Sequence, residues 1–186
     1  MKITLPDNSS RELPEGSSGY DLAKDIGPGL AKSAVAVSVD GVQRDLHDVI
    51  EGDASVSIIT IDSDEGIEIM RHTLTAQVLA RAIKNLYPKS KLAIGPTIDD
   101  GFYYDVESEK SISSDDLSKI EDEMKKIIKT KSSITKKLVS KSEALKVFKE
   151  NKESYKEIIV NESKQKDNFQ LYYQDDKKFV DLCRGP

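Results

Sequence analysis

Two residues in a predicted helix are the first candidates for catalytic chemistry in this chain. His72 lies in the stretch RHTLTAQVLARAIKNLYP, residues 71–88, and is one of only two histidines among 186 residues. Gln77 follows five positions later, where hydrolytic motifs often place a second histidine. An imidazole accepts and returns a proton near neutral pH, whereas an amide forms hydrogen bonds but cannot act as a general base. The stretch therefore offers one proton acceptor and one hydrogen-bonding group.

The spacing of these two residues does not suit a regular helix. In an α-helix, residues i and i+4 share a face, whereas residues i and i+5 point about 140° apart. Thr73 and Gln77 would therefore share a face, and His72 would converge with Gln77 only if a bulge, or a helix start after His72, absorbed one extra residue. The alternative is that His72 is a capping or surface group, and that Gln77 belongs to a polar helix face with Arg81 and Lys84.

Further polar or reactive candidates lie elsewhere in the chain. Cys183, in DLCRGP, is the single cysteine, which excludes an internal disulfide and fits a reducing cytoplasm. By default Cys183 is a small buried hydrophobic side chain, Asp181 an exposed carboxylate at a strand end, and Lys156 one lysine among many. Gly95, which precedes a proline, would let a ligand approach the backbone closely.

The elements of residues 1–62 predict a small β-grasp (ubiquitin-like) domain. KITLP and RELP form an opening hairpin, and SGYDLAKDI forms a helix that GPG stops. Asp40-Gly41 predicts a hairpin between β-branched runs, and SVSIITI is a final strand. This order of strands and helix argues against a doubly wound sheet, and the fold class is α+β.

Residues 63–186 predict a second α+β domain, with helices on one face of a mostly antiparallel sheet. A helix ends at Pro88, and KLAIGPTIDDGFYYDV contains two strands with a Gly-Pro turn and an Asp100-Gly101 turn. The next helix is capped by Ser114. The apolar face predicted for that helix consists of Leu117, Ile120, Met124, Ile127 and Ile128. The later elements are predicted as the strands ITKKLVS, KEIIV, FQLYYQ and KFVDLC and the helix KSEALKVFKEN.

The composition restricts which nucleic-acid and membrane partners we expect. The net charge is -5, so any contact with nucleic acid would need a local patch. Lys125–Lys137 supplies six lysines with no acidic or aromatic residue, which suits phosphates rather than bases, or simply a solvated helix face. We expect no DNA partner. We also expect no membrane partner, because no apolar run approaches the roughly 20 residues of a membrane span. With no leader pattern after Met1, we expect a cytoplasmic protein.

Several motifs occur in the order seen in threonyl-tRNA synthetases. They are DIGPGLAKSAVAVSVDG, SIITIDSDEGIEIMRH, IGPTIDDGFYYD, ESYK and VDLCRGP, and together they cover nearly the whole chain. The chain resembles the N-terminal region of these enzymes. Residues 1–62 are similar to the TGS domain, and residues 63–186 to the editing domain shared with alanyl-tRNA synthetases, truncated at its C-terminus. GTPases and stringent-response enzymes that carry TGS domains lack the second domain.

The resemblance implies partners and cofactors for a longer protein. The family joins threonine to its tRNA in a class II core that uses ATP with magnesium and a zinc ion. We expect that core to lie outside this chain, so no cofactor is expected here. The implied partner is the acceptor end of threonine tRNA, and the full-length protein is expected to be a homodimer through the core.

The resemblance also assigns roles to the candidate residues. Editing hydrolyses the ester of serine wrongly attached to the tRNA. His72 and Cys183 become the catalytic candidates, and the substrate-binding candidates are Thr73, Gln77, Gly95, Lys156 and Asp181. The family pattern His-x-x-x-His meets Ala76 when matched from the left and Gln77 when matched from the right, which indicates one inserted residue.

Two hypotheses for the function of this region follow from the resemblance. The region is either an editing hydrolase or a non-catalytic module that positions tRNA. Gln77 and the extra residue favour the second hypothesis. The family's last histidine would follow Pro186.

Overall fold

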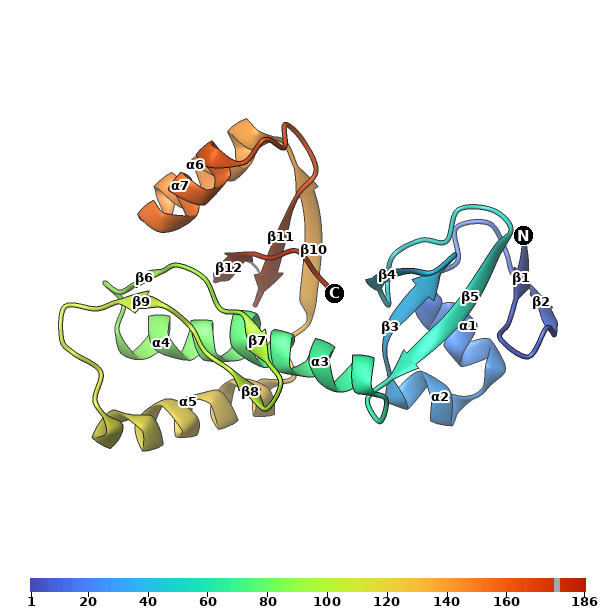
Figure 1. Cartoon of the computed structure of the whole chain (residues 1–186), viewed down its shortest axis with the longest axis horizontal. Coiled ribbons are helices and arrows are strands. Elements are labelled where there is room, and N and C mark those ends of the chain that lie inside the picture. The colour runs from blue at the N-terminus through green and yellow to red at the C-terminus, as the bar shows by residue number, and fades with distance from the viewer. Residues whose placement is uncertain (176–177) are drawn as a thin grey trace. The chain divides into compact units, whose positions relative to one another are not determined.

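The computed structural model describes residues 1–175 and 178–186, which form two compact units. The first consists of Met1–Arg71 with Gly185–Pro186, and the second of His72–Arg184. The domain boundary predicted from sequence, between residues 62 and 63, precedes this division. Figure 1 labels the helices and strands of both units.

A five-stranded sheet with the order β2-β1-β5-β3-β4 forms the first unit. β1 and β5 are parallel, and the other neighbouring pairs are antiparallel. Leu22 of the first helix is fully buried with Ile3 and Val37 of the sheet, which makes the core of the predicted β-grasp fold. The elements are β1 (Lys2–Thr4), β2 (Ser10–Glu12), α1 (Gly19–Ile26), α2 (Pro28–Ser33), β3 (Ala34–Val39), β4 (Val42–Asp45) and β5 (Ala54–Thr60).

Local sequence signals account for the turns of this unit. Asp40 and Gly41 both have positive φ, 50° and 80°, as a type I′ hairpin requires, and they join β3 to β4 as predicted. Gly27 ends α1, and Pro28 occupies the first turn of α2, where its missing N–H costs no helical hydrogen bond. Asp40-Gly41 thus forms the predicted hairpin turn. The sequence GPG ends α1, as predicted, and also begins α2.

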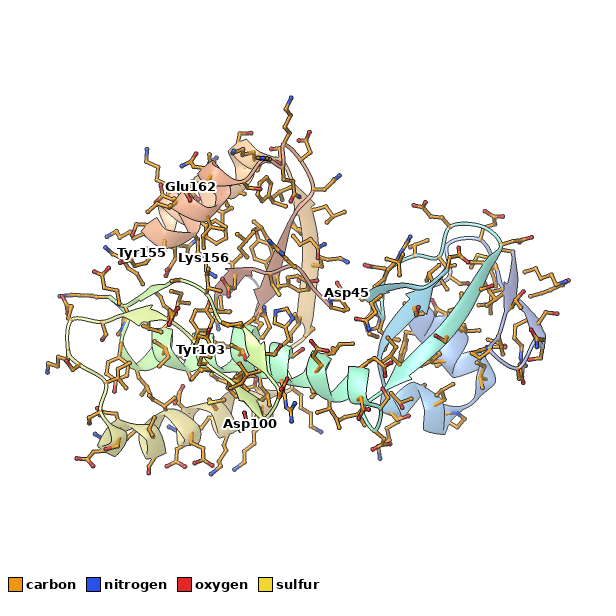
Figure 2. All side chains as sticks on the ribbon, viewed as in Figure 1. Asp45, Asp100, Tyr103, Tyr155, Lys156 and Glu162 are labelled. Carbon is orange, nitrogen blue, oxygen red and sulfur yellow. The ribbon has the colours of Figure 1, made fainter. Side chains whose placement is uncertain are left out.

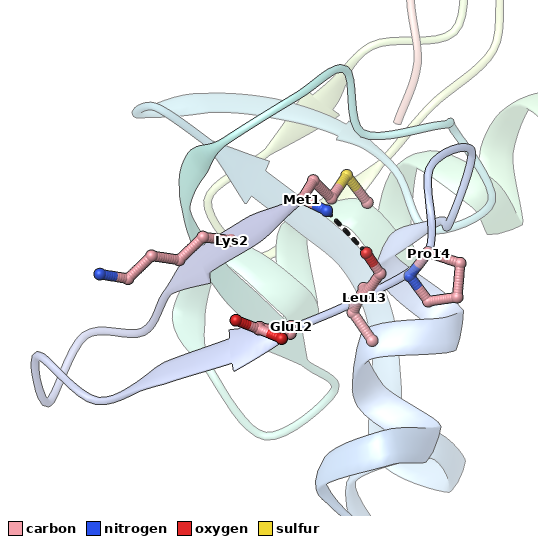
Figure 3. Close-up of a pocket in the computed structure, with 5 residues that line it drawn as sticks. All are labelled: Met1, Lys2, Glu12, Leu13 and Pro14. Atoms are coloured by element: carbon pink, nitrogen blue, oxygen red, sulfur yellow. Dashed lines mark hydrogen bonds between the residues drawn. The ribbon is translucent and has the colours of Figure 1, made fainter.

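A hollow in the first unit is lined by the N-terminus and the strand that follows the first turn (Figure 3). The terminal amine of Met1 donates to the Leu13 carbonyl oxygen at 2.8 Å, so this charge is engaged within the unit. None of the candidate site residues lies there. The lining residues are Met1, Lys2, Glu12, Leu13 and Pro14.

Helical residues run from Asp64 to Leu86 and lead into the second unit. They form α3 (Asp64–Thr73), a π-helical segment η1 (Leu74–Leu79) and α4 (Ala80–Leu86). α5 (Leu117–Thr130) follows a short 3-10 turn η2 (Ser114–Asp116) and contributes Ile120 and Ile127 to a core shared with Ile83 of α4. No helix among the described residues is long and apolar enough to cross a membrane.

Two predictions for α5 were wrong in detail. Leu117 and Ile128 are exposed, at 59% and 52%, because the buried stripe of this helix is narrower than its apolar content suggests. Ser113, and not Ser114, caps the first turn, because its backbone N–H and hydroxyl donate to the Asp116 carboxylate.

One long hairpin spans the segment KLAIGPTIDDGFYYDV. It contains β6 (Lys91–Leu92), β7 (Thr97–Ile98), β8 (Gly101–Phe102) and β9 (Val106–Glu107). The predicted Gly-Pro turn is wrong, because the Tyr103 N–H still donates across the hairpin to the Pro96 oxygen at 3.3 Å. The chain reverses at residues 99–100, one residue before the predicted Asp100-Gly101 turn, because Gly101 pairs with Ile98.

An antiparallel sheet with the order β10-β11-β12 and two helices complete the second unit. Its strands are β10 (Ile134–Val139), β11 (Phe169–Gln174) and β12 (Phe179–Leu182), and its helices are α6 (Lys141–Glu150) and α7 (Ser154–Glu162). The sequence KEIIV, predicted as a strand, lies in α7. Lys156 and Val160, one helical turn apart, are both buried, so the helical period decides which residues face inward.

Candidate functional site

A π-helical turn interrupts the helix between His72 and α4. The Ala80 N–H donates to the Thr75 oxygen, a step of five residues in place of the α-helical four. Such a turn accommodates one extra residue within an otherwise α-helical run. The bulge that convergence of His72 with Gln77 requires is therefore present, and Thr75, Ala76 and Gln77 are all buried in it.

His72 and Cys183 contact each other although they are 111 residues apart in the sequence. The His72 Nε2 atom lies 3.2 Å from the Cys183 Sγ atom. His72 comes from the end of α3, and Cys183 follows β12, where its N–H donates to the Gln170 oxygen at 3.2 Å. Both side chains are half-buried. A thiol against an imidazole is an arrangement in which the ring can accept the thiol proton or donate to sulfur.

A closed triangle of polar groups is buried in the same unit. The Lys156 Nζ atom lies 2.8 Å from Asp181 Oδ1 and donates to the Tyr104 hydroxyl at 2.9 Å. That hydroxyl donates to Asp181 Oδ2 at 3.0 Å. Lys156 and Asp181 are only 4% and 1% exposed, so neither is the solvated group of the default interpretation. Figure 2 shows Lys156 on α7 and Tyr103, the neighbour of Tyr104, on the long hairpin.

Burial dominates the electrostatics of this triangle. It raises the pKa of the Asp181 carboxyl, while the Lys156 ammonium opposes that shift by stabilising the carboxylate. Burial, and then the charge of Asp181, raise the pKa of Tyr104, so its phenol remains protonated and able to donate. Cys183 is a further contributor to the raised pKa of Tyr104, which relates the triangle to the His72–Cys183 contact.

Gly95 packs against the ring of Tyr104. A Cβ atom at position 95 would lie 2.4 Å from Tyr104 Cδ2 and 2.5 Å from Thr75 Cγ2. Real Cβ atoms do not approach other atoms this closely, so the hairpin needs glycine here for packing. Side chains of the protein thus occupy the close approach that the sequence predicted for a ligand.

Gln77 is bound by a second glutamine. The Gln174 Nε2 atom donates to the Gln77 backbone oxygen at 2.7 Å and to Gln77 Oε1 at 2.8 Å. Gln77 is 4% exposed, and its Nε2 atom has no acceptor among the described residues. Gln77 therefore shares its partner Gln174 with Arg81, so the two residues lie on one polar face of the helix, and at Gln77 this face is buried.

The other polar residues of this helix also face partners in the unit. Arg81 donates to Gln174 Oε1 at 3.0 Å and forms an ion pair with Asp175. Lys84 lies 2.6 Å from Glu153 Oε1, and Glu153 Oε2 accepts from the Leu92 N–H at 3.0 Å. Thr73 is half-buried at the end of α3. The polar stripe predicted on this helix is thus mostly turned inward.

The lysine run has partners on its own helix. Lys125 lies 2.8 Å from Glu121, and Lys126 lies 3.1 Å from Glu123. These acidic residues precede the run, so the charge of α5 is more balanced than the run alone suggests. Within residues 1–175 and 178–186, no group of three or more histidine, cysteine, aspartate or glutamate side chains is placed to hold a metal ion.

Sequence reasoning missed three residues that build the site. Tyr104 was grouped with the structural residues of its strand, Gln174 was not singled out as the partner of Gln77, and Arg81 was not singled out as the partner of Gln174. Tyr104 lies in one quoted motif and its partner Asp181 in another, which is a usable signal. Gln174 carried none, because nothing in FQLYYQ indicates which side chain meets the π-helical turn.

Comparison with known proteins identifies both parts of the sequence. A TGS domain matches residues 1–60. The threonine–tRNA ligase of Hahella chejuensis is 45% identical over 184 residues, which is 99% of this chain and 28% of that relative. The chain thus spans little more than a quarter of the relative's length, and the match extends through the second unit as well as the TGS domain. By these two matches the chain carries a TGS domain and is similar, over almost its whole length, to a region that makes up 28% of a threonine–tRNA ligase.

Proposed function

We propose that the chain is the TGS and editing region of a threonine–tRNA ligase, and that its second unit hydrolyses tRNA carrying serine in place of threonine. The observation that supports this best is the 3.2 Å contact between His72 Nε2 and Cys183 Sγ. This contact joins two candidates that come from distant parts of the chain. The ligase reaction itself, with ATP, magnesium and zinc, belongs to a core outside these residues.

The chemistry is hydrolysis of an ester. Water attacks the carbonyl carbon that links serine to the terminal ribose, and His72 accepts the proton that the water loses. The bond from the carbonyl carbon to the ribose oxygen then breaks, and the proton passes to that oxygen. The products are free serine and uncharged tRNA. Cys183 orients the imidazole through their contact.

The buried triangle supplies this site with polar groups that are held by hydrogen bonds to one another. Lys156 donates to Asp181 and Tyr104, and an ammonium has three N–H groups, so one remains for a substrate oxygen. We propose that Lys156 and Asp181 bind the aminoacylated end of the tRNA, together with Thr73 and Gln77, whereas Gly95 serves the packing of Tyr104. A cytoplasmic location and a homodimer formed through the missing core complete this proposal.

A second candidate function rests on Gln77. An amide cannot accept a proton near neutral pH, and the oxygen of this one accepts a hydrogen bond from Gln174, which also donates to the Gln77 backbone oxygen. The region would then bind and position tRNA without hydrolysing the ester.

A deacylation assay separates the two functions. Threonine tRNA charged with radiolabelled serine is incubated with the chain, with a His72→Ala variant and with a matched His47→Ala variant. Editing requires rapid loss of the label that His72→Ala abolishes and His47→Ala leaves unchanged. Equal, background-level loss in all three samples would exclude the hydrolase and leave the positioning module.

A further inference from the structure

The side-chain amide of Gln77 is a hydrogen-bond donor whose direction the fold fixes. We propose that Arg81 and Gln174 are positioning residues that hold the Gln77 N–H₂ group toward a substrate oxygen. This inference rests on the editing or tRNA-positioning function proposed above and names a contact that either function would use.

The orientation of Gln174 follows from Arg81. A guanidinium can only donate hydrogen bonds, so the Gln174 atom 3.0 Å from Arg81 must be the amide oxygen. The ion pair with Asp175 holds Arg81 in place, because Asp175 also accepts from Ser132 at 2.6 Å. Hydrogen bonds to Ser132 and Arg81 lower the pKa of Asp175, which keeps this carboxylate charged.

The orientation of Gln77 follows in turn from Gln174. With its oxygen on Arg81, Gln174 must present its nitrogen to Gln77, and this nitrogen needs acceptors. It finds the backbone oxygen of Gln77 at 2.7 Å and the amide oxygen at 2.8 Å. The Gln77 amide therefore cannot flip without placing two N–H₂ groups against each other, and its own nitrogen points away from Gln174.

Among the buried side-chain nitrogen and oxygen atoms of the described residues, the Gln77 nitrogen alone lacks a hydrogen-bond partner. Gln77 is 4% exposed, so bulk water does not serve this donor. An unpaired buried donor costs as much as a lost hydrogen bond, and native proteins seldom leave one unused. The π-helical turn and the series of contacts from Asp175 through Arg81 and Gln174 thus fix the Gln77 N–H₂ group as a donor without an acceptor.

The chemistry of the donor restricts the acceptor. The group is neutral and donates only, so it suits a neutral oxygen better than a phosphate, which attracts lysine and arginine. On tRNA carrying serine the neutral oxygens near the reacting bond are the ester carbonyl, the serine hydroxyl and the terminal ribose hydroxyls. We therefore assign Gln77 to one of these oxygens.

The test uses an adenosine that carries serine through an amide at the ribose 3′ position, which the chain cannot hydrolyse. Binding is measured by calorimetry, and the Gln77 side-chain amide is followed by nitrogen-15 NMR. We expect its resonances to shift on binding, and Gln77→Met to weaken binding about tenfold, the effect of one lost hydrogen bond. The matched control is Gln165→Met, which replaces an exposed glutamine of the same unit.

Arg81 provides a separate test of positioning. Arg81→Lys retains a group that only donates, so the Gln77 resonances should still shift with the ligand. Arg81→Met removes the donor to Gln174 Oε1, so Gln174 is held only by its hydrogen bonds to Gln77, and the ligand-dependent shift and the tenfold advantage should both decrease while the unit stays folded by circular dichroism.

Each result bears on one claim. If the unmodified chain binds the analogue and Gln77→Met binds it equally well, the donor serves only a buried water and this inference is wrong, while the proposed function stands. If the unmodified chain does not bind the analogue at millimolar concentration, the proposed function is wrong and the inference falls with it.

Discussion

Gln174 donates from one side-chain nitrogen to two oxygens of Gln77, its backbone oxygen at 2.7 Å and its amide oxygen at 2.8 Å. The two residues lie 97 positions apart, on β11 and in the π-helical turn η1. A π-helical turn is a rare irregularity, and a partner outside the helix stabilises it by satisfying its backbone. The contact that holds the bulge therefore also fixes the side chain that the bulge carries.

The Tyr104 hydroxyl is predicted to be important for stability. Tyr104→Phe leaves Lys156 and Asp181 in contact but removes a buried group that bonds to both. We expect a loss of about 1–3 kcal/mol in the free energy of unfolding, measured by urea denaturation. The matched control is Tyr103→Phe, because Tyr103 is 50% exposed, and its effect should stay within about 0.5 kcal/mol. Equal effects of the two changes would contradict the buried triangle.

Gly95 is predicted to tolerate no side chain. In Gly95→Ala the new methyl group would overlap Tyr104 and Thr75, so the hairpin or the helix must shift. We expect a cost of about 1–3 kcal/mol, as for other overpacked cores, seen as a lower thermal midpoint. Gly101→Ala in the same hairpin is the control, because a Cβ atom there meets nothing within 4 Å. If Gly95→Ala unfolds at the same temperature as that control, the close packing is wrong.

The parts of the fold that were predictable from sequence are those with a local physical cause. Asp40-Gly41 specifies its hairpin because few residues adopt positive φ twice in succession. The prediction of a strand for KEIIV was wrong because a short apolar run fits a strand as well as a helix. Packing inside the unit favours the helix α7. The position of the turn was predicted one residue too late, because Asp100-Gly101 is as good a turn signal as residues 99–100.

The site was predictable only where the resemblance supplied the residues. Lys156 and Asp181 came from motifs, but the burial of both and their bonds to Tyr104 needed the tertiary structure. The resemblance indicated one extra residue near Gln77, and helical geometry left either a bulge or a helix start after His72 to absorb it; the structure has the bulge. The contacts of Gln174 with Arg81 and Gln77 were not predictable, because they depend on the register of β11 beside the helix.

The cap of α1 is predicted to make the first unit sensitive to acid. The backbone N–H and the hydroxyl of Ser18 both donate to Asp21 and lower its pKa. A lowered pKa in the folded state means that the stabilisation is present above the ordinary value of 3.8 and is lost as pH falls below it. Asp21→Asn should therefore cost about 0.5–1 kcal/mol at pH 7, and this cost should fall as the pH drops through the lowered pKa of Asp21. Hydrogen exchange of the α1 amides across this pH range would measure it, and a constant difference would contradict the prediction.

The contact between His72 and Cys183 is predicted to set the reactivity of the thiol. The thiolate is the nucleophile, and an imidazole 3.2 Å from the sulfur can take its proton. Because Cys183 is the only cysteine, the rate of alkylation by iodoacetamide reports on this side chain alone. We expect His72→Ala to slow alkylation at pH 7 by about three- to tenfold.

His47→Ala removes the other histidine, which stacks near Tyr20 in the first unit, and should leave the alkylation rate unchanged. If His72→Ala instead speeds alkylation, the imidazole shields the sulfur more than it activates it. That outcome would contradict the prediction that His72 activates the thiol, while the orienting role proposed for Cys183 would stand.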